Sequence, residues 1–133
     1  MAPALAAGNT LVIKPSEHAS ASIVALGKLV EQAGFPAGVV NIITGYGPSA
    51  GAALTRHPLV RHVAFTGGAA TARHVVRSSA ENFAHLSLER GGKSPQIVFP
   101  DADIDSAVNG IVAGVFAASG QSCVAGSRLL IHD

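Results

Sequence analysis

Residues 10–45 read TLVIKPSEHASASIVALGKLVEQAGFPAGVVNIITG, and this stretch decides the fold. Short aliphatic and β-branched runs at residues 10–13 and 39–43 flank a segment whose apolar residues recur at helical spacing. Ser16 is a suitable N-cap for a helix over residues 17–32, and the Gly-Phe-Pro that follows would end it. The stretch therefore predicts a strand, a helix and a second strand.

The same alternation continues to the end of the chain. Helices are expected over residues 49–55, 70–79 and 101–117, and strands over residues 60–65, 83–88, 95–99 and 128–131. Strands that alternate with helices predict an α/β fold with a largely parallel sheet. No turn or cap is visible before the first strand, and the last strand has no evident partner.

Composition limits what the chain can do alone. Charged residues make up 13% and hydrophobic residues 48%, whereas soluble domains average roughly 25% charged residues. Much of the surface is therefore expected to be covered by other polypeptide. The net charge of +1 is dispersed and aromatic residues are few, which argues against nucleic acid as a partner. A single cysteine fits a reducing cytoplasm, and no apolar run is long enough to span a membrane.

Two glycine-rich segments could contact a phosphate group. The pattern Gly45-x-Gly47-x-x-x-Gly51 is one residue longer than the dinucleotide fingerprint, so a plain glycine-rich turn is the favoured interpretation. The segment Phe65-Thr66-Gly67-Gly68 is better placed, because its two glycines open a helix and can expose backbone N–H groups to an anion. Tight packing of a strand against a helix would require the same glycines.

Charged residues occupy two strand ends. Lys14 and Glu17 flank the first strand-to-helix turn, where they could hold ribose hydroxyls, or where Glu17 could simply favour the helix dipole. The segment Leu88-Glu89-Arg90-Gly91-Gly92-Lys93 places an acid at another strand end, which is where α/β sheets carry their sites. A surface ion pair is the alternative.

The only thiol, Cys123, follows Gly120-Gln121-Ser122 in a small, polar and turn-forming setting. That setting favours exposure and nucleophilic chemistry, although a lone cysteine is more often a small buried hydrophobe. The six histidines show no metal-ligand spacing, so no metal site is predicted.

Together these segments resemble the NAD(P)-dependent aldehyde dehydrogenase superfamily. Phe65-Thr66-Gly67-Gly68 is similar to its F-T-G-S motif, Leu88 to Lys93 to its L-E-L-G-G-K motif, and Gly120 to Cys123 to its G-Q-x-C motif. The resemblance implies a Rossmann-like cofactor-binding portion in residues 1–90. It implies the start of a second α/β, catalytic domain in residues 91–133.

The resemblance also implies roles for single residues. Cys123 would be the nucleophile and Glu89 the base that activates water. The residues expected to contact NAD, with NADP as the alternative cofactor, are Lys14, Glu17, Gly47, Phe65, Thr66, Gly67, Gly68 and Arg90. An aldehyde would be the substrate, the compartment would be the cytoplasm, and the full-length protein would form a homo-oligomer.

The chain departs from the family pattern at two positions and in length. Gly68 replaces the usual serine and Arg90 the usual leucine, and family members are several times longer. The isolated chain is therefore expected to be inactive. Two alternatives stay open: a non-catalytic nucleotide-binding or assembly fragment, and a CoA-acylating relative that uses the same cysteine.

Overall fold

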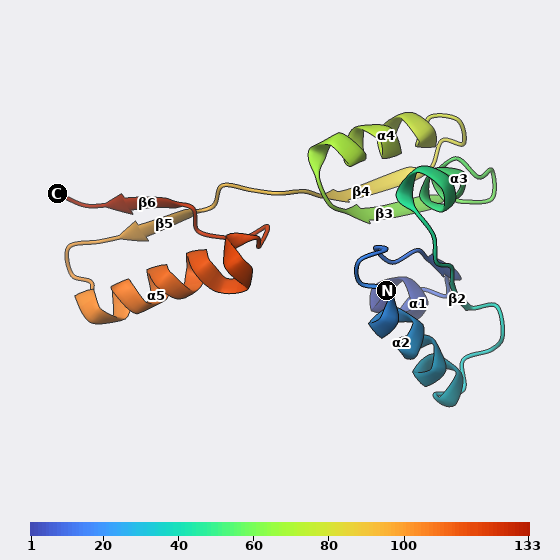
Figure 1. Cartoon of the computed structure of the whole chain (residues 1–133), viewed down its shortest axis with the longest axis horizontal. Coiled ribbons are helices and arrows are strands. Elements are labelled where there is room, and N and C mark those ends of the chain that lie inside the picture. Colours follow the sequence, from blue (N-terminus) through green and yellow to red (C-terminus); the bar gives the residue numbers. More distant parts are fainter. The chain divides into compact units, whose positions relative to one another are not determined.

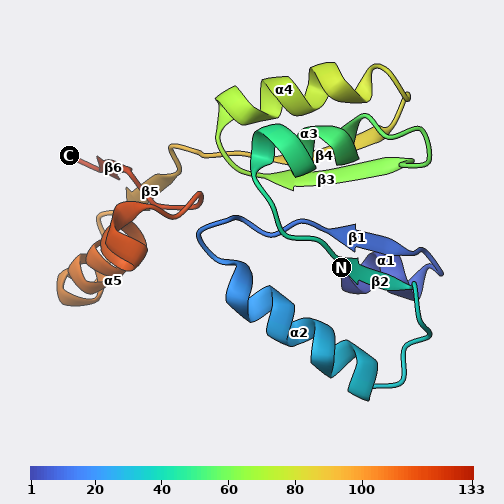
Figure 2. The same cartoon turned by 45° about the vertical axis from the view of Figure 1, so that its right-hand side comes forward.

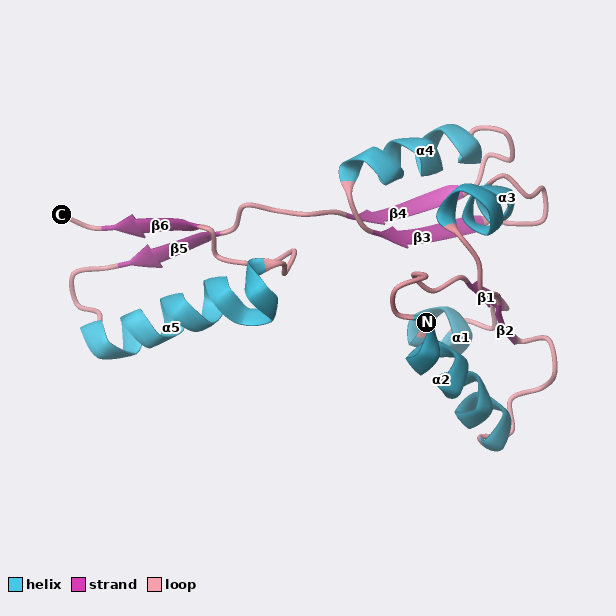
Figure 3. Ribbon diagram, in the orientation of Figure 1, coloured by secondary structure: helices cyan, strands magenta, loops and turns pink.

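The computed structural model describes residues 1–133 as helices and short parallel strand pairs (Figures 1 and 3). The chain divides into two compact units, of which the first comprises Met1–Val63 with Arg77–His85 and the second Ala64–Val76 with Leu86–Asp133. The strands pair as β1–β2, β3–β4 and β5–β6 in three two-stranded sheets. The predicted α/β class is confirmed.

The first strand–helix–strand segment forms as the sequence predicts. Strand β1 (Leu11–Ile13) pairs in parallel with β2 (Val40–Ile42), and α2 (Ser20–Gln32) runs beside them (Figure 2). The helix approaches the strands closely at Gly27, where an added Cβ would lie 3.0 Å from the Cδ1 atom of Ile42. Helix α2 thus covers one face of the strand pair.

The start of α2 differs from the prediction. The helix begins at Ser20 rather than Glu17, because Ser16 organises a turn before it. The Ser16 hydroxyl accepts a hydrogen bond from the His18 N–H, and the Ser16 carbonyl accepts from the Ser20 hydroxyl at 2.8 Å. Local side-chain bonds of this kind compete with helix formation. Glu17 therefore lies in a turn and not in the first turn of a helix.

A short helix that the sequence did not reveal precedes β1. Helix α1 (Ala2–Ala6) has a proline in its first turn, a position where the missing N–H costs nothing. The expectation that no structured turn precedes the first strand was wrong. Alanine-rich sequence favours helix strongly, and that propensity is the signal that could have revealed α1.

The middle of the chain carries a π-helix, two α-helices and a strand pair. The π-helix η1 (Gly47–Gly51) leads into α3 (Ala52–Thr55). Strand β3 (His62–Thr66) precedes α4 (Ala69–Ser79), and β4 (His85–Glu89) follows it. One backbone hydrogen bond joins the start of β3 to the start of β4, and another joins their ends. The two strands are therefore parallel.

The last segment is a second strand–helix–strand unit. Strand β5 (Pro95–Val98) pairs in parallel with β6 (Arg128–Ile131), and they are connected through α5 (Ile104–Phe116) and the short helix η2 (Ala117–Gly120) (Figure 1). Asp103 caps α5 by accepting a 2.8 Å hydrogen bond from the Ser106 N–H. The expectation that the last strand lacks a partner was wrong, because Arg128 pairs with Pro95, 33 residues upstream, and such a distant parallel partner is not visible as a local pattern.

Few side chains are buried within this chain. The buried apolar residues are Ala72, Val75 and Ala125, while many large apolar side chains are exposed, among them Phe83 at 92% and Leu59 at 78%. Scattered exposed hydrophobes are normal, but a surface this apolar is typical of faces that pack against other protein. This agrees with the low charge content.

Candidate active site

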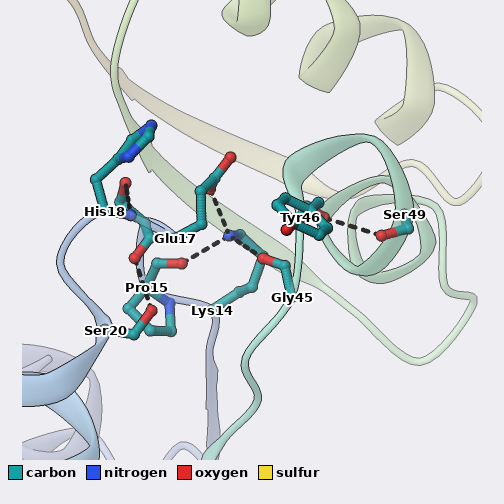
Figure 4. Close-up of polar contacts among 9 residues, drawn as sticks. Lys14, Pro15, Glu17, His18, Ser20, Gly45, Tyr46 and Ser49 are labelled. Atoms are coloured by element: carbon teal, nitrogen blue, oxygen red, sulfur yellow. Dashed lines mark hydrogen bonds and ion pairs between the residues drawn. The ribbon is translucent and has the colours of Figure 1, made fainter.

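Lys14 connects the end of β1 to the glycine turn that follows β2. Its Nζ atom donates hydrogen bonds to the carbonyl oxygens of Pro15 at 2.6 Å and Gly45 at 2.9 Å, and it forms a 3.6 Å ion pair with Glu17 (Figure 4). The side chain is 14% exposed. The ammonium group is therefore held by backbone carbonyls and points toward the carboxylate.

Glu17 presents a charged carboxylate from the turn after β1. A hydrogen bond from its own backbone lowers the pKa of Glu17, desolvation opposes this in part, and attraction to Lys14 and His18 lowers the pKa further. The side chain is 37% exposed. A carboxylate that stays ionised and reachable can accept hydrogen bonds from the hydroxyls of a ligand.

Gly45, the first glycine of the turn after β2, is more constrained than Gly47, which the sequence analysis expected to contact the cofactor. Gly45 has φ 151°, and an added Cβ there would lie 2.7 Å from that of Ala50, whereas a Cβ on Gly47 would meet nothing within 4 Å. The carbonyl of Gly45 also accepts a hydrogen bond from the Lys14 ammonium group. Gly45 is thus a residue whose part in the site the sequence pattern did not reveal, while Gly47 opens the helix η1.

The segment of residues 65–68 is joined to the end of β4. The Gly67 N–H donates a 3.0 Å hydrogen bond to the carbonyl of Glu89, and a Cβ on Gly67 would lie 2.7 Å from the Phe65 ring. Thr66 is the last residue of β3, and α4 starts just after Gly68. A Cβ on Gly68 would meet nothing within 4 Å, so this turn has open space above its backbone.

Glu89 and Arg90 stand at the strand end that the sequence predicted. Glu89 is the last residue of β4, and both side chains are exposed. The hydrogen bond from Gly67 fixes the Glu89 backbone. The carboxylate is thereby presented at the carboxyl end of a parallel strand.

Cys123 is an exposed free thiol in the segment between η2 and β6. Its backbone N–H makes no hydrogen bond within the chain. Residues 118–120 all have positive φ, of 51°, 58° and 71°, a conformation that costs of order 1–2 kcal/mol for a residue with a Cβ. Such strain is concentrated at functional sites.

The backbone of Cys123 lies against the segment that follows Glu89. An added Cβ on Gly92 would be 2.9 Å from the Cys123 carbonyl oxygen, closer than real Cβ contacts come. The second unit thus holds Phe65, Thr66, Gly67, Gly68, Glu89, Arg90 and Cys123, and the first unit holds Lys14, Glu17 and Gly47. No three His, Cys, Asp or Glu side chains come together as metal ligands, and no helix is long and apolar enough to cross a membrane.

Comparison with known proteins decides the family. The model of the aldehyde dehydrogenase family matches residues 1–133. The chain belongs to the aldehyde dehydrogenase family. It is 64% identical over 131 residues to the (Z)-2-((N-methylformamido)methylene)-5-hydroxybutyrolactone dehydrogenase of Acinetobacter baylyi, covering 98% of this chain and 27% of the relative. It is 53% identical to hydroxyisobutyraldehyde dehydrogenase of Mycolicibacterium austroafricanum, covering 100% of this chain and 26% of that protein.

Solved structures agree with the sequence relatives. The NAD+ complex of aldehyde dehydrogenase from Bacillus cereus superposes with a TM-score of 0.92 at 48% identity, covering 97% of this chain and 26% of that one. PnpE in complex with nicotinamide adenine dinucleotide gives a TM-score of 0.93 at 51% identity, covering 98% and 27%. The chain spans about a quarter of the length of these relatives.

Proposed function

We propose that the protein carrying these residues oxidises an aldehyde to a carboxylic acid with NAD+, using Cys123 as nucleophile and Glu89 as base. One observation carries the proposal: Gly92, three residues after Glu89, lies against the carbonyl of Cys123. The segment that follows the proposed base and the backbone of the proposed nucleophile therefore lie against each other within one compact unit. Family membership and the NAD complexes of related structures support the cofactor and the reaction.

The turn after β1 fits the ribose of a dinucleotide. Glu17 is ionised and exposed, so its carboxylate can accept hydrogen bonds from ribose hydroxyls. Lys14 uses two of its N–H groups on the carbonyls of Pro15 and Gly45. Its third faces Glu17 across 3.6 Å, which is long enough for that N–H to turn toward a sugar hydroxyl. Lys14 thus orients Glu17 and remains able to donate to the ribose.

The turn between β3 and α4 fits the pyrophosphate. Open space above Gly68 lets a phosphate approach the backbone at the N-terminus of α4, where N–H groups and the helix dipole favour negative charge. Phe65 packs its ring under Gly67 and fixes the turn. We assign Thr66 and Gly47 to the walls of this site, and Arg90 to its nicotinamide end.

The chemistry begins at the thiolate of Cys123. Its sulfur adds to the aldehyde carbon, the carbonyl electrons move to oxygen, and the unpaired Cys123 N–H can donate to that oxyanion. NAD+, when bound, supplies the acceptor for a hydride. Loss of the hydride from the thiohemiacetal carbon leaves a thioester on Cys123. Glu89 takes a proton from water, the hydroxide attacks the thioester, and the thiolate leaves as the acid forms.

Cofactor binding and nucleophilic attack are proposed to belong to different parts of the chain. We assign residues 1–90 to a Rossmann-like cofactor-binding portion and residues 91–133 to the start of the catalytic domain. A reducing compartment such as the cytoplasm would keep Cys123 in the thiol form that the reaction needs. The many exposed apolar side chains support burial in a larger assembly, which we propose is a homo-oligomer.

The test measures NADH formation by the whole protein with a panel of aldehydes. We expect aldehyde-dependent NADH from the unaltered protein and none from Cys123→Ala, with NAD+ affinity nearly unchanged in the variant. Wild-type turnover by Cys123→Ala would overturn the proposed nucleophile. NAD+ binding without NADH from any aldehyde would identify a nucleotide-binding protein instead, and NADH that requires added CoA would identify an acyl-transferring relative.

A further inference from the structure

An amide side chain occupies the inward face of β5 where an apolar residue is expected. Gln96 and Val98 are the half-buried positions of this strand, and Pro95 and Ile97 are exposed. A polar group costs free energy when it is removed from water unless it is hydrogen-bonded. The bonds that Gln96 makes therefore show what its amide does.

Gln96 bonds to the backbone on both sides of the space between α5 and the loop that carries Cys123. Its Nε2 atom donates to the carbonyl of Gly126 at 2.8 Å and to that of Ile111 in α5 at 3.3 Å. Gly126 is buried, and its own N–H donates to the carbonyl of Gly114 at 3.0 Å. Gly126 is thus held through both of its backbone polar groups, three residues after Cys123.

Two glycines shape the space that the amide fills. A Cβ on Gly126 would overlap the Cγ, Cδ and Nε2 atoms of Gln96, and a Cβ on Gly114 would lie 3.1 Å from its Oε1 atom. The backbone of α5 and that of the loop therefore close directly on the Gln96 side chain. Such packing leaves the amide little freedom to reorient.

The loop over residues 117–127, here termed the Cys123 loop, needs an anchor of this kind. On its amino-terminal side the backbone is strained, with positive φ at Ala118 and Ser119. At its centre Cys123 is exposed, and the nearest side-chain bond, from the Val124 N–H to the Ser122 hydroxyl, is long at 3.4 Å. Strained segments persist only where the surrounding structure holds them.

We propose that Gln96 is a positioning residue: it anchors Gly126 to α5 and so fixes the direction in which the Cys123 loop presents its sulfur and backbone N–H. This inference rests on the proposed function. Gln96 does not touch the reacting atoms, so its effect should fall on the step in which the thiolate attacks and the hydride leaves. A displacement of about 1 Å in a reacting group can cost about 10²-fold in rate.

The test uses two substitutions in the whole protein and one matched control. Gln96→Met keeps the size of the side chain and removes both hydrogen bonds. Gln96→Glu keeps the shape, but its ionised carboxylate cannot donate to the two carbonyls, whereas its protonated form can donate to one of them. Gln32→Met makes the same chemical change at an exposed position at the end of α2.

We expect Gln96→Met to lower the rate constant of the NADH burst by roughly 10-fold to 100-fold, with KM for NAD+ little changed. Hydrogen exchange should quicken in the Cys123 loop and not in the paired strands. For Gln96→Glu, the ratio of its burst rate to that of the unaltered protein should rise as the pH falls and the introduced carboxyl becomes protonated. Gln32→Met should behave as the unaltered protein.

Three outcomes separate the hypotheses. Unchanged burst rate and unchanged loop exchange in Gln96→Met overturn the positioning role and leave the proposed function intact. If Gln96→Met fails to fold, a pH-independent ratio for Gln96→Glu overturns the positioning role. Absence of NADH from the unaltered protein overturns the proposed function, and loop exchange in Gln96→Met then decides whether Gln96 anchors the loop.

Discussion

Gly92 and Cys123 touch through their backbones: a Cβ built on Gly92 would lie 2.9 Å from the carbonyl oxygen of Cys123. No flexible side chain could yield there, because the facing atom belongs to the backbone. Glu89 lies three residues before Gly92, so their Cα atoms are at most roughly 11 Å apart. Two segments separated by 30 residues in sequence thus meet where the proposed base and nucleophile are needed.

The first prediction concerns this contact. Gly92→Ala should lower kcat by about 10²-fold, because the added methyl group pushes the Cys123 carbonyl and reorients the loop. Gly91→Ala is the matched control, since a Cβ on Gly91 would meet nothing within 4 Å. Steady-state NADH formation and a thermal melt of each variant give the comparison. Equal activity of the two variants would show that the contact is not needed for turnover.

The second prediction separates the two half-reactions. Glu89→Gln retains the size of the side chain but cannot take a proton from water, so thioester hydrolysis should slow by about 10²–10⁴-fold. The burst of NADH that precedes hydrolysis should survive. Rapid-mixing measurements of burst amplitude and steady-state rate provide the check. If burst and steady state fall together, Glu89 positions the site and does not act in deacylation.

The sequence predicted most of the elements of this chain because their signals are local. The aliphatic and β-branched runs of the strands and the acidic residues at the start of α5 lie within or next to the elements themselves, and the strand bounds agree within about two residues. The start of α2 was predicted wrongly because Ser16 satisfies its bonds within a turn. A propensity argument cannot weigh that competing set of bonds.

The candidate site was harder to predict than the fold because it is made by contacts distant in sequence. The Gly45 carbonyl accepts a hydrogen bond from Lys14 across 31 residues, and the Gly126 carbonyl accepts one from Gln96 across 30. The motifs identified Glu89 and Cys123 as candidates, but nothing local indicates that Gly92 must be small because of Cys123. The parts played by these glycines and by the Gln96 amide follow only from how the chain packs in three dimensions.

The third prediction is cofactor choice. The ionised Glu17 carboxylate would repel a 2′-phosphate and lose the hydroxyl to which it is expected to bond. Lys14 offsets part of this repulsion, so kcat/KM should favour NAD+ without excluding NADP+. Glu17→Gln should bring the kcat/KM values for NAD+ and NADP+ closer together. Measured kcat/KM that favours NADP+ in the unaltered protein would contradict the assignment of Glu17.

The fourth prediction is the pH dependence of NAD+ binding. The pKa of Glu17 lies below its ordinary value in the folded chain, chiefly through the hydrogen bond from its own backbone. The negative charge on Glu17 that is proposed to favour NAD+ binding is therefore fully present above the ordinary glutamate pKa. It is lost as the pH falls through the lowered pKa of Glu17. KM for NAD+ should stay flat through neutral pH and rise only in that acidic range. Glu17→Gln should show no such rise, which a titration of both proteins between neutral and acidic pH can establish.

The fifth prediction concerns a protein made of these 133 residues alone. Large apolar side chains are exposed in both compact units, including Leu59 at 78% and Ile131 at 65%, and β6 is paired on one edge only. Exposed apolar surface beside an open strand edge promotes aggregation.

Such a protein should be poorly soluble and should form no NADH from any aldehyde, since it spans about a quarter of its relatives. Cys123 should still react with iodoacetamide, because alkylation requires only exposure and some thiolate. Light scattering, an NADH assay and mass spectrometry of the alkylated chain test these three statements on one preparation. Robust aldehyde-dependent NADH from a soluble monomer would mean that the described residues already contain every group that turnover needs, and the apolar faces would then require a different explanation.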